Sequence, residues 1–439
     1  MATAKKQRNY AVDFWRMFAT LAVCWGHMGS VGFRFTSGGV NYPSSTLLTE
    51  GPVLGVFLVF TGYFMMKSFE GKKLRGLNDG KSASSLALTY LKTRYLGLWP
   101  ALFIGTLFGY LMCMAGSLTG LWHGKLLTVG EDFNGIKDII ASLNSTILQW
   151  FGLDSTGILA DTGYSFSWNA PMWYISAIFV AGYLFYYLLC KNEDLTRGLI
   201  VPLVVIICPC MWAMSDLSMN DRGYGALAFG MFDNALVFGS WGTALGIFLY
   251  RPYEALRKMK IGEKGKRWLT VIHVILAAWL VYICIAGLDG LYITSDEIRI
   301  NSEMYVDLVV AVTMIFAVAN QDYLTQKVFN HKIFGTLGEF SLYFFIVHIH
   351  VINLVCGLVG GENVTTSWQY YLCLLAVIIL SCILGFICQV ICKKGIQPLL
   401  YKLDNAIQTC TRNGQIERGE IPAVEAAPAA AQAAATKAK

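Results

Sequence analysis

The stretch that decides the fold is Tyr10–Gly29, YAVDFWRMFATLAVCWGHMG. Its apolar length suits a helix that crosses a bilayer, so it predicts a first membrane span. Three ionisable residues interrupt it, namely Asp13, Arg16 and His27. Each such side chain costs at least a few kcal/mol in hydrocarbon, so their presence together indicates a function. The alternative explanation is a structural ion pair and a buried, hydrogen-bonded histidine.

The spacing of these residues predicts how they lie on the helix. Asp13 and Arg16 are three residues apart and can meet on one face, so we expect a structural ion pair between them. Arg16 and His27 are eleven residues apart, close to three turns, and share roughly the same face. Their separation along the axis is about 16 Å at 1.5 Å per residue. The helix therefore carries a fixed cation near one membrane surface and a titratable imidazole deeper in.

The composition indicates a polytopic membrane protein. Of 439 residues, 55% are hydrophobic and 14% charged, and the mean hydropathy is +0.52. The net charge of +6 does not indicate a nucleic-acid partner, because the basic residues lie in loops that flank apolar runs. The 12 cysteines show no CxxC or Cys/His spacing, so we expect no metal site and no bound cofactor. The HExxH, GxSxG and phosphate-binding glycine motifs of soluble enzymes are absent.

The expected fold class is an all-α, polytopic transmembrane bundle of about ten spans. With the N-terminus inside, the inner segments hold 27 of the 34 lysines and arginines and the outer loops hold five. By the positive-inside rule, both termini are then cytoplasmic. The expected spans are residues 10–33, 50–66, 90–116, 171–190, 198–214, 224–250, 268–288, 303–319, 333–358 and 368–392.

Three regions follow from this pattern. Residues 1–9 form a cytoplasmic N-terminus, residues 10–395 the membrane domain, and residues 396–439 a cytoplasmic tail. The low-complexity end of the tail predicts disorder after about residue 415. A multi-pass protein of the plasma membrane is expected, with membrane lipids as partners.

Further ionisable residues fall in or beside the expected spans. Arg94 enters from the cytoplasmic side, like Arg16, and two arginines at that depth can bind a phosphate; snorkelling to lipid phosphates is the alternative. Glu50 stands at the same outer end as His27 and could orient the imidazole, or it could be a solvated interface residue. Asp233 and Asp307 are alternative partners for His27.

The ninth span contains His348 and His350, which are two residues apart and therefore point to different sides of a helix. We expect one to face the bundle and the other an interface. His273 in the seventh span is expected to be a satisfied core histidine. The outer segment ends in SFSWNAPMW (165–173), whose aromatic residues suit an interfacial belt or a sugar platform.

Five blocks in order resemble membrane-bound acyltransferase family 3. Arg16 with His27 resembles the first-helix signature of that family, and RYLGLWP resembles its RxxRxxP block. Gly97 stands where the second arginine of that block is usual, and Thr61 where serine is usual. The remaining blocks are FLVFTGYFM (57–65), MWYISAIF (172–179) and LGEFSLYFFIVH (337–348).

The resemblance implies an integral-membrane O-acyltransferase. Such an enzyme moves an acyl group, usually acetyl, from cytoplasmic acyl-CoA, its co-substrate, to a hydroxyl of a cell-surface or lipid-linked glycan. It implies that His27 is catalytic, and the position of Glu50 at the same outer end makes it the expected residue that orients the imidazole. It also implies that Arg16 and Arg94 bind the donor, and Lys92 is a substitute for the arginine missing at 97.

The acceptor is expected on the outer side, beside Trp168, Trp173 and His348. The chain has no room for an appended hydrolase-like domain, so transfer finishes within the membrane domain or with a separate extracytoplasmic partner enzyme. A multi-pass transporter or flippase of a glycan or small molecule, without acyl transfer, fits the buried charges as well. A membrane sensor without catalysis is a third reading.

Overall fold

The structure is a computed structural model. It describes residues 8–30, 35–37, 40–42, 50–119, 140, 143, 147–153, 168–214, 227–228, 232–286, 302–360 and 363–417. The chain divides into two compact units, Met1–Gln389 and Val390–Lys439. The larger unit therefore ends near the expected domain boundary at residue 395.

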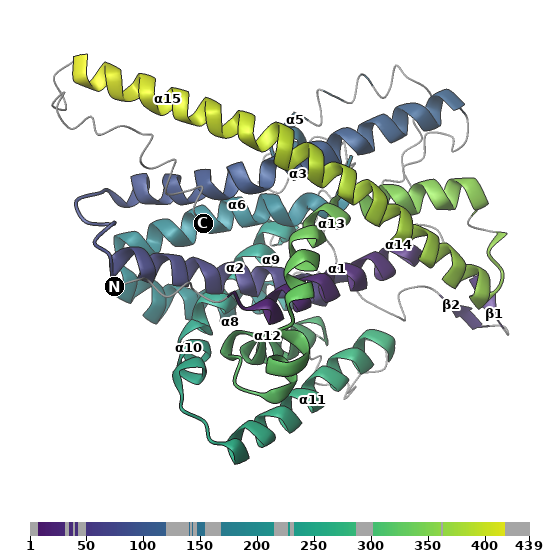
Figure 1. Ribbon diagram of the computed structural model, residues 1–439, viewed down its shortest axis with the longest axis horizontal. Coiled ribbons are helices and arrows are strands. Elements are labelled where there is room, and N and C mark those ends of the chain that lie inside the picture. Colours follow the sequence, from purple (N-terminus) through teal and green to yellow (C-terminus); the bar gives the residue numbers. More distant parts are fainter. Residues whose placement is uncertain are drawn as a thin grey trace. The chain divides into compact units, whose positions relative to one another are not determined.

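Each of the ten expected apolar segments contains a helix of at least 14 residues (Figure 1). The helices are α1 (Tyr10–Ser30), α2 (Glu50–Lys73), α3 (Ala83–Thr119), α6 (Trp173–Lys191), α8 (Val201–Met214), α9 (Asn234–Phe248), α11 (Glu263–Ala286), α12 (Ser302–Ala319), α13 (Lys332–Val359) and α14 (Ser367–Val390).

Short elements join them. The helical ones are α5 (Ile147–Trp150), η3 (Ala170–Met172), α7 (Glu193–Leu195), η4 (Thr196–Ile200), α10 (Tyr250–Lys258) and η6 (Thr325–Phe329). The all-α expectation needs a small correction, because two antiparallel hairpins are present. They pair β1 (Phe35–Ser37) with β2 (Val40–Tyr42), and β3 (Leu227–Ala228) with β4 (Phe232–Asp233).

Six helical stretches among the described residues are long and apolar enough to cross a membrane. They begin at Val53, Ala83, Trp173, Glu193, Lys332 and Ser367. Large apolar side chains remain exposed on helices such as α11 and α14, as expected where lipid rather than water surrounds a helix. The chain is therefore a helical membrane protein, and the number of ten spans remains an expectation.

Close helix packing in the larger unit depends on small residues. Helices α2, α6 and α9 pack against one another. A Cβ atom on Gly62 of α2 would lie 2.0 Å from the carbonyl oxygen of Thr243 on α9. A Cβ atom on Gly246 of α9 would lie 2.1 Å from the carbonyl oxygen of Val59 on α2. The two helices thus meet backbone to backbone, the contact that glycine permits between membrane helices.

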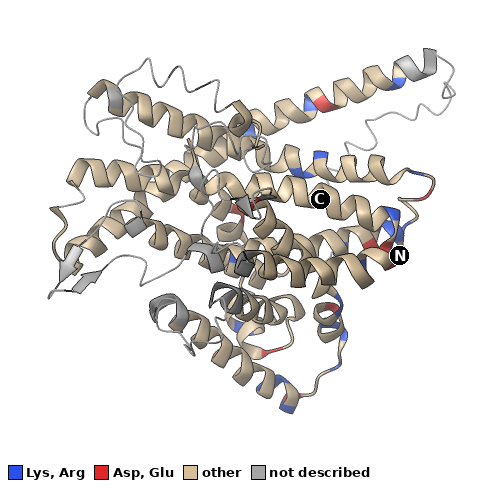
Figure 2. Ribbon diagram, turned by 180° about the vertical axis from the view of Figure 1, so that it is seen from behind, with Lys and Arg blue, Asp and Glu red and all other residues tan. Residues whose placement is uncertain are grey.

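The charged residues of the larger unit lie toward the ends of helices (Figure 2). Many gather where the N-terminus lies, and most of each helix body carries none. The smaller unit contains η8 (Ile391–Ile396) and α15 (Gln397–Glu417). The tail expected from residue 396 is therefore helical to Glu417, and its end from residue 418 lies outside the described residues.

Candidate functional site

The first feature of the site is a pair of histidines on packed helices. Helix α1 packs along α13. This packing places Nδ1 of His27 2.7 Å from Nε2 of His348, with the two ring planes within 15° of parallel. His27 is 9% exposed and His348 is fully buried. A buried hydrogen bond of this length fixes the orientation of both rings.

The proton positions follow from a second contact. Nδ1 of His348 lies 2.6 Å from the carbonyl oxygen of Phe345. A carbonyl can only accept, so Nδ1 of His348 carries the hydrogen, and Nε2 of a neutral His348 is an acceptor. His27 then donates its Nδ1–H to His348, and its own lone pair lies on Nε2. This is the tautomer of an imidazole that can take a proton at Nε2.

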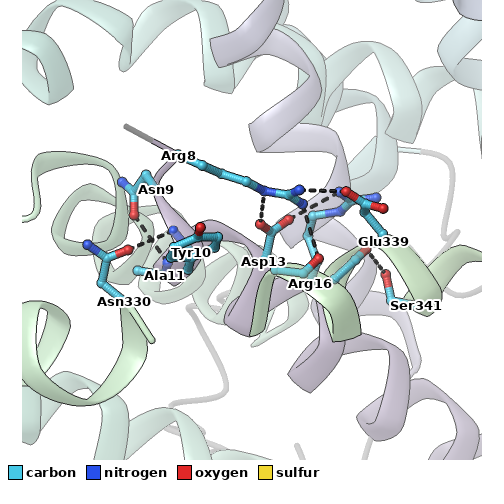
Figure 3. A network of polar contacts seen from close by, with 11 residues as sticks. Arg8, Asn9, Tyr10, Ala11, Asp13, Arg16, Asn330, Glu339 and Ser341 are labelled. Carbon is cyan, nitrogen blue, oxygen red and sulfur yellow. Dashed lines mark hydrogen bonds and ion pairs between the residues drawn. The ribbon is translucent and has the colours of Figure 1, made fainter. Parts of the chain in front are cut away.

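The N-terminal end of α1 forms a network of ion pairs (Figure 3). The side chain of Arg8 donates to Asp13 at 2.8 Å, to Glu339 of α13 at 2.5 Å and to the carbonyl of Gly335 at 3.2 Å. Arg16 lies 3.7 Å from Asp13. Asp13 therefore has the expected ion pair with Arg16 and a closer one with Arg8. The sequence alone placed Arg8 only in the N-terminal segment, residues 1–9.

Glycine allows the two helices to meet at this network. A Cβ on Gly338 would lie 2.4 Å from the Cβ of Asp13. A Cβ on Gly335 would lie 2.7 Å from the ring of Tyr10. Any larger residue at either position would push α13 away from α1. The register that brings His27 to His348 is thus set about three to four turns away, at the end of the same helix pair where α1 begins.

Arg94 lies on α3 with its guanidinium carbon 5.3 Å from the centroid of the Tyr90 ring. It is close enough to Arg16 for the two charges to interact. Lys92, the expected substitute for a second arginine, is exposed. Among the described residues, no atom lies within 4 Å of the position that a Cβ on Gly97 would take. Two arginines from different helices thus share one electrostatic environment.

Three aromatic rings from different helices contact one another beside the histidine pair. They are Phe57 of α2, Tyr174 of α6 and Phe345 of α13, here called the aromatic wall. Tyr174 lies 5.2 Å from Phe345 and 5.9 Å from Phe57, measured between ring centroids. Phe345 lies 5.2 Å from the ring of His348, and Tyr174 is within electrostatic range of Arg16. The wall thus contacts His348 at one ring and lies within electrostatic range of Arg16 at another.

The three residues expected on the acceptor side differ in how far they are buried and in what they contact. Trp168 is fully buried, packs edge-on against Tyr110 at 5.2 Å and donates its backbone N–H to Gln149. Both the membrane belt and the sugar platform require an exposed ring face, and Trp168 presents none in this structure. Trp173 is half-buried against Phe238. His348 lies beside His27 itself.

Two further histidines, His273 and His350, are core residues. His350 is 1% exposed and faces α3 beside Gly109, so the expectation that one histidine of this pair faces an interface is wrong. His273 is buried as expected, with Nδ1 3.1 Å from Asp322. Its Nε2 has no hydrogen-bond partner, so it is only partly satisfied. Burial alone would raise the pKa of Asp322. Hydrogen bonds from His273 and Thr325 outweigh this effect, so the pKa of Asp322 lies below its ordinary value.

Of the three carboxylates considered for orienting His27, the structure describes the side chain of Asp233 only. Asp233 caps α9, where it accepts from the N–H groups of Ala235 and Leu236. The side chains of Glu50 and Asp307 lie outside the described residues, so the role of Glu50 stays a prediction. Among the described residues, no group of three or more His, Cys, Asp or Glu side chains could hold a metal ion.

Comparison with known proteins supplies the context for this geometry. The family model of the acyltransferase domain, Acyl_transf_3, matches residues 9–386. The match includes both histidines of the pair, both arginines and the aromatic wall. No curated protein and no solved structure matches the chain.

Proposed function

The chain belongs to the acyltransferase 3 family, and from that premise we propose that it is an acyl-CoA-dependent O-acyltransferase of the plasma membrane. It moves an acyl group, acetyl in the simplest case, from cytoplasmic acyl-CoA to a hydroxyl of a cell-surface or lipid-linked glycan. The observation that carries the proposal is the hydrogen bond between His27 and His348, on the same helix as Arg16. It prepares an imidazole to accept a proton, as acyl transfer to a hydroxyl requires.

The donor is proposed to lie along the inner part of α1. Arg16 and Arg94 offer guanidinium groups, which bind phosphate through two parallel hydrogen bonds. His27 is about 16 Å farther along the helix by rise per residue, a distance that a pantetheine arm can bridge. The mostly apolar arm is proposed to pack along the aromatic wall, because one ring of the wall contacts His348 and another is within electrostatic range of Arg16. The thioester then reaches His27 while the phosphates stay near the cytoplasm.

The chemistry at His27 is proton transfer. Nε2 takes the proton of the acceptor hydroxyl as that oxygen attacks the thioester carbon. The carbon–oxygen bond forms, the carbon–sulfur bond breaks, and the departing thiolate takes the proton back from the imidazolium. A relay in which His27 itself carries the acyl group for one step uses the same residues. The first route needs the lone pair of Nε2 to face the acceptor hydroxyl, and the relay needs it to face the thioester carbon.

The acceptor is proposed to enter from the outer end of α1. Trp173 is half-buried and begins α6, and of the two tryptophans it is the one that retains an exposed surface for a sugar. A separate extracytoplasmic enzyme that receives or modifies the product fits the same arrangement. The alternative function, a transporter or flippase, uses buried charges without acyl transfer.

One assay separates these functions. Purified protein in detergent or nanodiscs is given acetyl-CoA and a hydroxyl acceptor, and free thiol is measured. An acyltransferase releases thiol in proportion to acylated product, whereas a transporter releases none. Mass spectrometry of surface glycans from cells with and without the protein then identifies the acceptor. Absence of thiol release with every acyl-CoA and acceptor fraction tested would favour the transporter.

The proposed topology places the donor side in the cytoplasm. In a background without native cysteines, Lys137→Cys should react with an impermeant maleimide on intact cells. Lys260→Cys should react only after permeabilisation, because its loop belongs to the basic inner segments. The reverse labelling pattern would move Arg16 and Arg94 to the outer side and remove the case for a cytoplasmic donor.

Arg94 is expected to bind the donor rather than the acceptor. Arg94→Ala should weaken acyl-CoA binding by roughly 1–3 kcal/mol, the range for a lost hydrogen bond to a charged group. Isothermal titration with acetyl-CoA measures this, and the melting temperature in detergent reports whether the variant is folded. An unchanged affinity in folded Arg94→Ala would exclude the residue from the donor site.

A further inference from the structure

Two cations, Lys72 of α2 and Arg94 of α3, each lie over one of two stacked tyrosine rings. The rings of Tyr90 on α3 and Tyr186 on α6 are 4.3 Å apart and within 9° of parallel. Arg94 lies 5.3 Å from the centroid of Tyr90, and Nζ of Lys72 on α2 lies 5.3 Å from the centroid of Tyr186. Three helices thus contribute to one arrangement, here called the cation–tyrosine stack, made of Lys72, Tyr186, Tyr90 and Arg94.

The charges around Lys72 are positive. Its electrostatic neighbours are Arg75, Lys81 and Arg94, together with the thiol of Cys190. Cations that lie close together repel one another. An anion that binds among them relieves this repulsion and is therefore stabilised there. Lys72 is half-buried, and its ammonium lies over the ring face of Tyr186, so a cation–π contact helps to hold it in position.

The carboxylates nearby are engaged by other residues. Glu193 accepts from Lys73 at 2.7 Å and from Arg197 at 2.7 Å. Glu70 accepts from Arg197 at 3.2 Å and from Tyr250 at 2.8 Å. Two adjacent lysines of α2 therefore differ, because Lys73 has a carboxylate partner and Lys72 is surrounded by cations. This difference gives a matched pair of residues for a test.

We propose that Lys72 and Arg94, held by the stacked rings of Tyr186 and Tyr90, form a phosphate-binding site for the nucleotide part of the acyl donor. The proposal rests on the proposed function, which supplies a donor with several phosphate groups. Two cations on separate helices suit a ligand that carries more than one phosphate. Lys72 takes the part that sequence reasoning gave to Lys92, which is exposed.

The test compares two donors and two lysines. Lys72→Met keeps an unbranched side chain over Tyr186 but removes the charge, and Lys73→Met is the matched control. With acetyl-CoA, Lys72→Met should raise KM about 10-fold, as expected for a lost charged hydrogen bond. With S-acetyl-pantetheine, which has no nucleotide phosphates, the KM of Lys72→Met should equal that of the wild type. Lys73→Met should change neither constant, and Lys72→Arg should restore the KM for acetyl-CoA.

Other outcomes would overturn the proposal. An unchanged KM for acetyl-CoA removes Lys72 from the donor site, and an equal rise with both donors assigns it a structural role. A rise found only in nanodiscs with anionic lipid, and absent in phosphatidylcholine alone, assigns the site to a lipid headgroup. A direct titration of wild-type protein with CoA separates failure of the proposed phosphate site from failure of the proposed function. Binding without an effect of Lys72→Met rejects this site alone, whereas no binding rejects the acyl-CoA-dependent function as well.

Discussion

Purified His27→Ala is expected to fold and to lose at least about 100-fold in kcat/KM for acyl transfer. Removal of a positioned general base typically costs 10²–10⁴-fold. The proposed proton acceptor is the lone pair on Nε2, because Nδ1 of His27 donates to His348. Thiol release from acetyl-CoA in the presence of acceptor measures the rate. Donor affinity should stay close to that of the wild type, because the phosphate contacts lie about 16 Å away by helix rise.

His331→Ala is the matched control for this prediction. His331 is exposed, and its side chain caps the start of α13, where it accepts from the N–H of Ile333. Its removal should leave kcat/KM within about 2-fold, since substitutions outside a site change little beyond local stability. Turnover near the wild-type rate in folded His27→Ala would refute the catalytic assignment and with it the mechanism.

The fold was largely predictable because membrane helices are specified by apolar length. Each expected segment contains a helix, even where its ends differ. Helix α3 begins at Ala83 rather than near residue 90, since its first turns are polar and carry no hydropathy signal. The tail helix α15 was missed for the same reason. Both errors occur where a helix continues out of an apolar segment.

The candidate site was predictable only along one helix. The shared face of Arg16 and His27 follows from periodicity, which depends on local spacing. The contact between His27 and His348 joins residues 321 apart, and no local pattern reports such a pairing. Sequence reasoning therefore sought a carboxylate to orient His27 and placed His348 with the acceptor. A possible signal was that LGEFSLYFFIVH ends in a histidine within an apolar run, where a polar side chain needs a partner.

Arg8 and the buried Trp168 illustrate two further limits. Arg8 resembles any basic residue before a membrane span, and only the packing of α1 on α13 shows its contacts with Asp13 and Glu339. An aromatic-rich segment likewise does not report which of its rings is covered. Trp168 is covered because α3 approaches closely at Gly109, where a Cβ would lie 1.9 Å from the Trp168 carbonyl oxygen.

His348→Phe is expected to lower kcat/KM on the order of 100-fold although His27 remains. Phenylalanine keeps a ring in the same place but cannot accept the Nδ1–H of His27. Loss of the group that fixes the tautomer of a catalytic imidazole can cost up to about 10⁴-fold. His348→Gln should recover part of the rate, because its amide oxygen can accept the same hydrogen. His350→Phe, two residues along α13 and facing α3, tests whether any bulky change there has a similar effect.

A variant that carries both His27→Ala and His348→Phe shows whether His348 only orients His27 or contributes to the rate on its own. If His348 acts only through His27, then His27→Ala with His348→Phe should be no slower than His27→Ala alone, because residues that act as a unit are not additive. If the two losses multiply, His348 contacts a substrate independently, as its expected acceptor-side role would require. A kcat/KM of His348→Phe equal to that of the wild type would show that the tautomer of His27 is fixed by another group. The side chain of Glu50, at the outer end of α2, would then be the next to replace, by Gln, with the same double-variant comparison.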